Sequence, residues 1–198
     1  MTFHWKKYIA EGIGAAALTL MVLTSIRFHL PLSTPLIAGL TLGFFVYAIG
    51  GISGSHINPA VTVGLWSVKK INSTDAVGYV VFQIVGALLT QKVFEATFSH
   101  LPVLPNAVTL PIAVAEAAGA AVLLFGISAA VMGKVSAGAS GLLVGGSLLL
   151  GILLASTVSN GVLNPAVAIG LGSISWPYIV GPVVGAVASC QLYRWLVS

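Results

Sequence analysis

Six long apolar stretches dominate this 198-residue chain and constrain its fold more than any other feature. A bilayer core needs about 20 consecutive apolar residues for each helical crossing. Only 6% of the residues are charged, whereas a soluble domain carries about 25%. Such a chain cannot build a soluble surface, so we predict an all-α integral membrane protein. The expected crossings are Tyr8–Ser25, Pro35–Ile52, Ala76–Phe98, Leu110–Met132, Gly138–Val158 and Trp176–Val197.

Basic residues set the expected orientation, because cytoplasmic loops of membrane proteins carry an excess of Lys and Arg. We expect both termini on the cytoplasmic side of a plasma or inner membrane. The basic residues are scattered along the chain and form no cluster, which argues against a nucleic-acid partner. This orientation leaves Arg27 and Lys92 at or near the outer side. It places six basic residues inside, namely Lys6, Lys7, Lys69, Lys70, Lys134 and Arg194.

The chain contains an internal repeat. The segment Asn58–Leu65 matches Asn164–Leu171 at an offset of 106 residues, and Glu11 recurs as Glu116. Each half holds three crossings, and an odd number inverts the second half in the membrane. Inverted repeats place a transport site near the midplane, at the repeat interface. We predict one domain over residues 1–198, with repeats over about 8–99 and 110–198.

Each half also carries a segment too short to span a bilayer. Asn58–Ser67 and Asn164–Ser173 would extend only about 15 Å as helices. Asn is a strong N-cap, and Pro is tolerated at the first helical position, so each Asn-Pro-Ala predicts a helix start. Gly- and Ser-rich loops precede both segments. Non-helical backbone at that depth must be covered by protein or line a wet cavity, which indicates two re-entrant half-helices.

At this point the sequence resembles the major intrinsic proteins, the family of aquaporins and aquaglyceroporins. The resemblance rests on Ser53–Thr62, on the two Asn-Pro-Ala copies and on the paired glutamates. It implies six transmembrane helices and two re-entrant half-helices in an inverted 3+3 repeat. It further implies a passive channel, assembled as a homotetramer with one pore per protomer. The implied pore centre comprises Asn58, Pro59, Ala60, Asn164, Pro165 and Ala166.

The resemblance also implies roles for the two loops. Backbone carbonyl groups near Ser55, His56 and Ile57, and near Ser159, Asn160 and Gly161, would accept hydrogen bonds along the pore. A carboxylate inside a span is costly and therefore suggests a function. The expected function of Glu11 and Glu116 is to brace the backbone N–H groups of the loops. His56 is likewise expected to brace its loop.

The expected selectivity filter departs from the family pattern. Alignment on the asparagines assigns it to Ala38, Ile152, Gly161 and Val167. Most family members have Arg where Val167 stands, and the glycerol-selective members have Asp where Ala168 stands. Without the charge and the five N–H donors of Arg, the filter should be wider and more apolar. It could then admit glycerol, urea, ammonia or hydrogen peroxide, or the aliphatic ring could dewet and close.

Three other hypotheses remain open. A structural or gated-closed protein could use the same fold, and an inverted-repeat secondary transporter could use the buried acids. Gly51–Gly54 also matches the Gly-x-Ser-Gly motif of rhomboid-type serine proteases. That enzyme needs a His base from a later span, and no His follows His100. We therefore expect no catalytic residue, metal or cofactor. The expected partners are the lipid bilayer, other copies of the chain, water and small neutral solutes.

Overall fold

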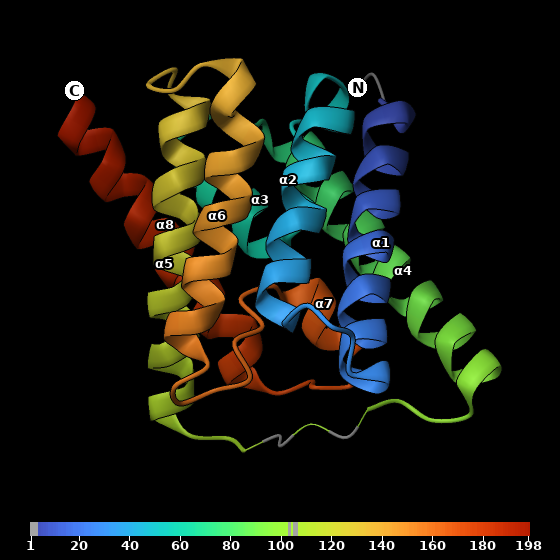
Figure 1. Ribbon diagram of the computed structural model, residues 1–198. Helices are drawn as coiled ribbons and strands as arrows, with labels where there is room; N and C mark the ends of the chain where they lie inside the picture. Colours follow the sequence, from blue (N-terminus) through green and yellow to red (C-terminus); the bar gives the residue numbers. More distant parts are fainter. Residues whose placement is uncertain (1–3, 103, 105–106) are drawn as a thin grey trace.

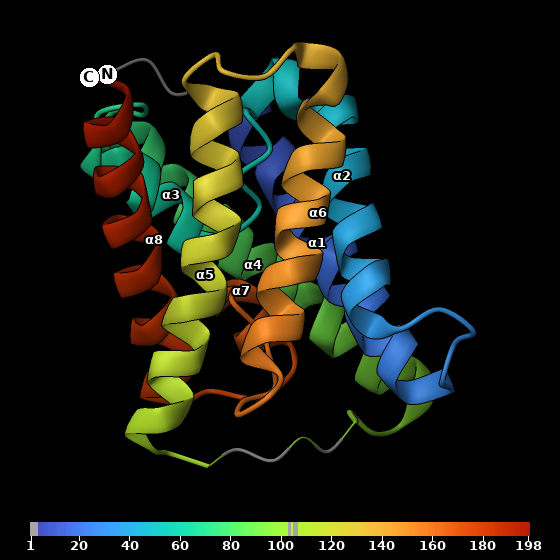
Figure 2. The same cartoon turned by 60° about the vertical axis from the view of Figure 1, so that its left-hand side comes forward.

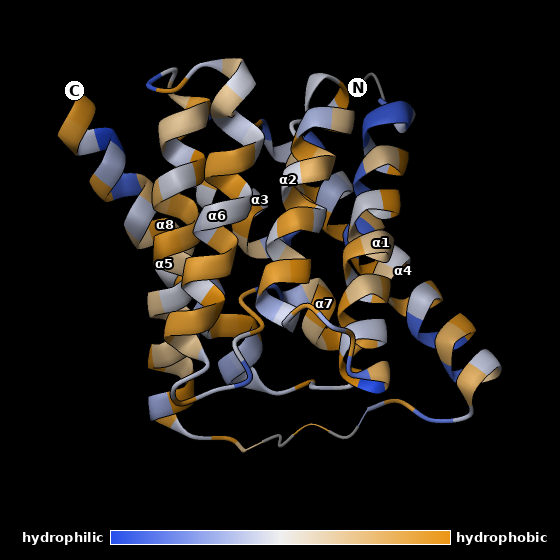
Figure 3. Ribbon diagram, in the orientation of Figure 1, coloured by the Kyte–Doolittle hydropathy of each residue, from blue (hydrophilic) through white to orange (hydrophobic). Residues whose placement is uncertain are grey.

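In the computed structural model, residues 4–102, 104 and 107–198 are described, and they form eight α-helices (Figure 1). Six of them are long and apolar enough to cross a membrane. Most residues along these helices are hydrophobic, and hydrophilic residues are more frequent near the helix ends (Figure 3). The six are α1 (Trp5–Phe28), α2 (Thr34–Ser53), α4 (Ser73–Phe98), α5 (Leu110–Val131), α6 (Ala137–Ala155) and α8 (Trp176–Val197). The predicted all-helical membrane fold is confirmed, and the predicted crossings differ from these helices by at most a few residues at each end.

The long helices pack in pairs that repeat in the second half. Helix α1 packs against α4, as α5 packs against α8. Helices α2 and α6 cross at a glycine contact that joins the two halves. A Cβ atom on Gly39 would lie 2.7 Å from the carbonyl oxygen of Gly145, and one on Gly43 would lie 2.8 Å from that of Gly141. Small residues at these positions therefore let the two backbones approach closely.

The two remaining helices are short and lie between the long ones (Figure 2). Helix α3 (Pro59–Ser67) packs against α8, and α7 (Pro165–Gly170) packs against α4. Each half-helix is thus held by a long helix of the other repeat. Helix α7 ends earlier than the predicted Ser173, because the chain turns at Gly172, whose φ of +74° is left-handed. Such a conformation favours glycine and does not continue a right-handed helix.

Candidate functional site

The two asparagines of the repeated motif begin the half-helices. Asn58 has an extended backbone, and its Oδ1 accepts a hydrogen bond from the Ala60 N–H at 2.8 Å. Asn164 also has an extended backbone, and its Oδ1 accepts hydrogen bonds from the Ala166 N–H at 3.0 Å and the Val167 N–H at 3.4 Å. A proline follows each asparagine and removes one N–H that would otherwise lack a partner. The sequence therefore starts both helices in the same way.

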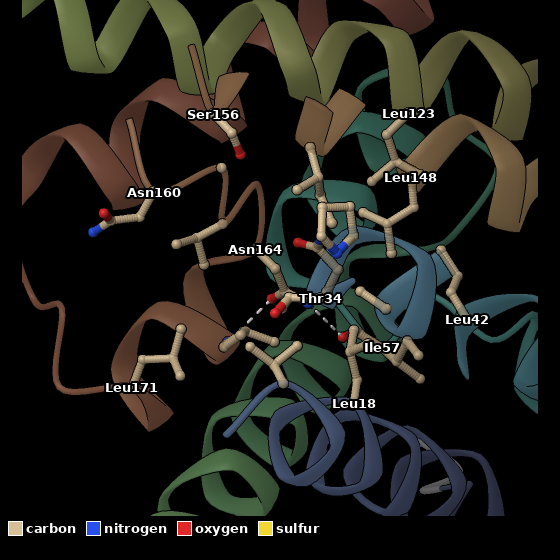
Figure 4. A pocket seen from close by; sticks show the side chains of 18 of the residues that line it. Leu18, Thr34, Leu42, Ile57, Leu123, Leu148, Ser156, Asn160, Asn164 and Leu171 are labelled. Atoms are coloured by element: carbon tan, nitrogen blue, oxygen red, sulfur yellow. Dashed lines mark hydrogen bonds between the residues drawn. The ribbon is translucent and has the colours of Figure 1, made fainter. Parts of the chain in front are cut away.

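The same two side chains also connect the repeats. Asn58 Nδ2 donates to the Leu163 carbonyl oxygen at 3.0 Å. Asn164 Nδ2 donates to the Ile57 carbonyl oxygen at 3.0 Å (Figure 4). An amide nitrogen carries two hydrogens, so each asparagine keeps a second donor beyond this bond. Both asparagines line the same cavity. Their neighbours Pro59, Ala60, Pro165 and Ala166 are buried and do not line it.

Glu11 lies behind the first loop and is fully buried. Its carboxylate accepts hydrogen bonds from the His56 N–H at 2.9 Å and the Ile57 N–H at 2.5 Å. It also accepts from the Ser53 hydroxyl at 2.6 Å and from Gln83 Nε2 at 2.8 Å. These donors satisfy a carboxylate that would be costly in this environment. They also hold a backbone that is left-handed at Ser55 and Ile57.

Glu116 holds the second loop from the corresponding place. It accepts hydrogen bonds from the Val162 N–H at 3.0 Å, the Leu163 N–H at 2.6 Å and the Ser159 hydroxyl at 2.8 Å. Ser159 therefore points to this carboxylate and does not line the cavity. Both glutamates lie outside the cavities described below and contact the loops that shape them.

A cavity of about 210 Å³, which we call the outer cavity after the predicted orientation, lies on the side of the asparagines where α2 begins and α6 ends. Its wall includes all four residues of the predicted filter, Ala38, Ile152, Gly161 and Val167. It also includes Ile57 and Asn160 from the two loops. Asn58 and Asn164 both line it, and Asn164 points toward the other lining residues in Figure 4. The four residues of the predicted filter thus line one cavity, whose described wall carries no Lys, Arg, Asp or Glu side chain.

A second cavity of about 440 Å³, which we call the inner cavity after the same predicted orientation, lies on the opposite side of the first loop. It shares His56 and Val61 with the outer cavity, and Ser55 contributes to its wall. His56 is buried between the two cavities. Its Nδ1 lies 3.1 Å from Thr62 Oγ1. The two cavities therefore meet at a side chain that is tied to α3.

Sequence reasoning missed several residues that line the outer cavity. Thr34 and Ser156 add hydroxyl groups at its mouth, and Leu18, Leu123 and Leu148 form its apolar wall. Leu18 and Leu123 occupy matching places in the repeat, at an offset of 105 residues. This repeat match could have been used to predict that both leucines line the cavity. Thr34 and Ser156 carry no such signal.

Comparison with known proteins gives consistent results. The model of the family "Major intrinsic protein" matches residues 1–193. The chain is 33% identical to Aquaporin AqpM of Methanothermobacter thermautotrophicus, over 94% of this chain and 91% of that protein. It is 33% identical to Aquaporin NIP1-1 of Zea mays, over 94% of this chain and 70% of that protein.

A solved structure shares the same fold. The X-ray structure of the aquaglyceroporin from Plasmodium falciparum matches with a TM-score of 0.82 at 22% sequence identity. The match covers 98% of this chain and 97% of that one.

Proposed function

Because this chain belongs to the major intrinsic protein family, a family of membrane channels, we propose that it is a passive channel for water and small neutral solutes. The observation that carries the proposal is the outer cavity, whose described wall contains Asn58 and Asn164 together with Ala38, Ile152, Gly161 and Val167, and no Lys, Arg, Asp or Glu. No ion-coupling site is needed for this activity. The two buried glutamates are occupied by loop N–H groups and hydroxyls.

The passage would select against cations through its backbone. The half-helices α3 and α7 begin at the two asparagines, so their positive dipole ends face the centre of the path. The remaining Nδ2 hydrogens of Asn58 and Asn164 would donate to a passing water or hydroxyl group. Carbonyl groups of the loops would accept from it. A cation, including a relayed proton, meets donors and positive partial charge at this point.

The filter would set the solute class. Val167 follows Asn-Pro-Ala and is 3% exposed, and its aliphatic side chain offers no hydrogen bond. Ala38 lines the same cavity with a side chain of one carbon. The apolar side chains of this filter can contact the carbon atoms of a polyol at little cost in free energy, and they carry no positive charge that would repel a cation. We therefore infer permeability to glycerol, urea, ammonia or hydrogen peroxide in addition to water.

Stopped-flow light scattering on proteoliposomes tests the proposal. A sucrose gradient should shrink the vesicles faster than empty liposomes, and a glycerol or urea gradient should give fast re-swelling. Ala38→Phe provides the matched control, because an aromatic ring at this wall should slow re-swelling while the protein remains folded. Fast shrinkage without re-swelling would contradict the wide filter. Shrinkage no faster than that of empty liposomes would favour a closed or purely structural protein.

We further propose a homotetramer with one pore per protomer and both termini in the cytoplasm. The orientation follows from Lys6, Lys7, Lys69, Lys70, Lys134 and Arg194, which belong to one side in this topology. Cross-linking in native membranes tests the tetramer. Accessibility of single cysteines introduced at Ser136 and Ser99, in a background where Cys190 is replaced, tests the orientation.

A further inference from the structure

Two adjoining hollows lie where α3 ends and α4 begins. The first, which we call the polar hollow for its two lysines, is lined by Lys69, Lys70, Ile71 and Asn72 of the connecting loop. The second is an apolar groove along α4, lined by Val63, Val77, Val80 and Val81 among others. Trp66 and Ser73 belong to both hollows and form the boundary between them.

The boundary between the hollows is a fixed structure. The indole Nε1 of Trp66 donates to the Ser73 hydroxyl at 3.0 Å, which joins the end of α3 to the start of α4. Trp66 is half exposed. An indole ring with one apolar face and one polar edge favours the level of the lipid headgroups. The polar hollow therefore lies at headgroup depth and the groove lies at acyl-chain depth.

The two lysines carry charge that no carboxylate of this chain neutralises. The sequence has four acidic residues, and each is engaged elsewhere. Glu11 and Glu116 accept from the loops, and Glu95 pairs with Lys92 at 2.9 Å. Asp75, the acid nearest in sequence, lies 3.6 Å from Lys7 and accepts from Tyr8 and Asn72. Within the described chain, Lys69 and Lys70 thus form no ion pair.

We propose that this junction binds one anionic phospholipid, with its phosphate at Lys69 and Lys70 and one acyl chain in the groove of α4. Charge complementarity selects an anionic headgroup, because juxtamembrane lysines attract acidic lipids. The groove from Ser73 to Val81 extends about 12 Å along the helix, which suits the upper part of an acyl chain. A soluble phosphate would satisfy the lysines and leave the groove empty. The combination of a cationic hollow and an apolar groove across Trp66 favours the lipid.

Lipid titration of the full chain in detergent, read by native mass spectrometry, tests the proposal. Phosphatidylglycerol should bind at least tenfold more tightly than phosphatidylcholine with the same acyl chains. Lys69→Gln combined with Lys70→Gln should weaken phosphatidylglycerol binding by roughly 25-fold, at about fivefold for each lysine. The matched control, Lys6→Gln combined with Lys134→Gln, removes the same charge from outside the hollow and should bind as the unmodified chain does.

A second pair of variants tests the groove. Val77→Phe should fill it and weaken binding severalfold, whereas Val93→Phe, at an equally exposed valine farther along α4, should not. Inorganic phosphate should compete poorly with phosphatidylglycerol. The proposal is overturned by equal binding of the two lipids, by equal effects of the two lysine pairs or by equal effects of the two valine variants. Effective competition by inorganic phosphate would overturn it as well, because the junction would then bind an anion and not a lipid.

Discussion

The two repeats hold their re-entrant loops with the same carboxylate and with different support behind it. In the first repeat, Gln83 Nε2 donates both to Glu11 and to the hydroxyl of Thr62, at 2.8 Å and 3.1 Å. In the second repeat, Pro182 takes the place of Gln83 and Ala168 takes the place of Thr62. We align α4 with α8 on Tyr79 and Tyr178, which are 99 residues apart. The Tyr79 hydroxyl donates to the Ser53 carbonyl oxygen, and the Tyr178 hydroxyl accepts from the Asn160 N–H. The repeats therefore share the backbone support and differ in the side-chain network.

The two cavities show the same pattern. Each residue of the proposed filter, which we call the outer ring, has a repeat partner 106 residues away that lines the inner cavity. The residues of both sets are aliphatic, except that the inner set has Ser55 where the outer ring has Gly161. Inverted symmetry therefore predicts a second narrow ring on the inner side. The outer ring is Ala38, Ile152, Gly161 and Val167, and the inner partners are, in the same order, Val144, Val46, Ser55 and Val61.

We expect the largest difference between the repeats when the buried carboxylates of Glu11 and Glu116 are removed. Glu11→Ala removes the acceptor for four donors, namely two backbone N–H groups, one hydroxyl and one side-chain amide. Glu116→Ala removes the acceptor for three donors, namely two backbone N–H groups and one hydroxyl. Each buried donor left without a partner costs about 1–3 kcal/mol. We expect Glu11→Ala to lower the free energy of unfolding by about 1–3 kcal/mol more than Glu116→Ala does. Equilibrium unfolding in mixed micelles measures both.

The double variant Gln83→Leu with Glu11→Ala provides the control. With the amide removed, the loss at the first loop should fall toward that at the second. Equal losses for the two single variants would show that the network behind Glu11 adds nothing to stability.

The glycine contact tests whether the repeats are equivalent where they meet. Gly39→Ala and Gly145→Ala both push a Cβ atom into a facing carbonyl oxygen, so each should lower the free energy of unfolding by about 1–3 kcal/mol. Gly146 has open space around its Cβ position. Gly146→Ala should therefore raise stability by about 0.5–1 kcal/mol, because alanine favours a helix more than glycine does. A clear difference between the first two variants would contradict the symmetry of this crossing.

A charge at Val167 should distinguish the outer ring in transport. In Val167→Arg, the guanidinium would narrow the passage and hold water by charge-assisted hydrogen bonds, each worth about 1.5–3 kcal/mol. Glycerol permeability should fall by about tenfold or more, while water permeability stays within the same order. Val167→Leu adds volume without charge and should retain glycerol flux. Equal glycerol flux in Val167→Arg and the unmodified chain, measured by stopped flow, would refute the assignment of this filter.

Sequence periodicity and the repeat were sufficient to predict the membrane fold, because apolar length and helix caps are local properties. The asparagine caps could be predicted for the same reason, since Asn-Pro starts a helix without help from distant residues. The bonds from Asn58 to Leu163 and from Asn164 to Ile57 could not, because they join positions about 106 residues apart. The network of Gln83, Thr62 and His56 draws on three separate elements and has no counterpart in the second repeat. Comparing the repeats therefore could not reveal it.

The smallest expected effect concerns Ser55, whose backbone has a φ of +53°, close to the +62° of its partner Gly161. A left-handed conformation costs a non-glycine residue about 1–2 kcal/mol. The Ser55 hydroxyl is buried and has no hydrogen-bond partner among the described residues. Ser55→Gly should therefore raise the free energy of unfolding by up to about 1 kcal/mol, and water permeability should change less than twofold.

The reverse exchange at the outer ring should fail. In Gly161→Ser, the new Cβ would collide with the Ser156 hydroxyl and lie 2.9 Å from the Ile152 carbonyl oxygen. We expect this variant to be destabilised and to transport poorly, as unfolding and stopped-flow measurements would show. If Gly161→Ser were as stable as the unmodified chain, the outer ring would be roomier than this packing allows. The asymmetry would indicate that the glycine fixes the shape of the outer ring, whereas the inner ring accepts either residue.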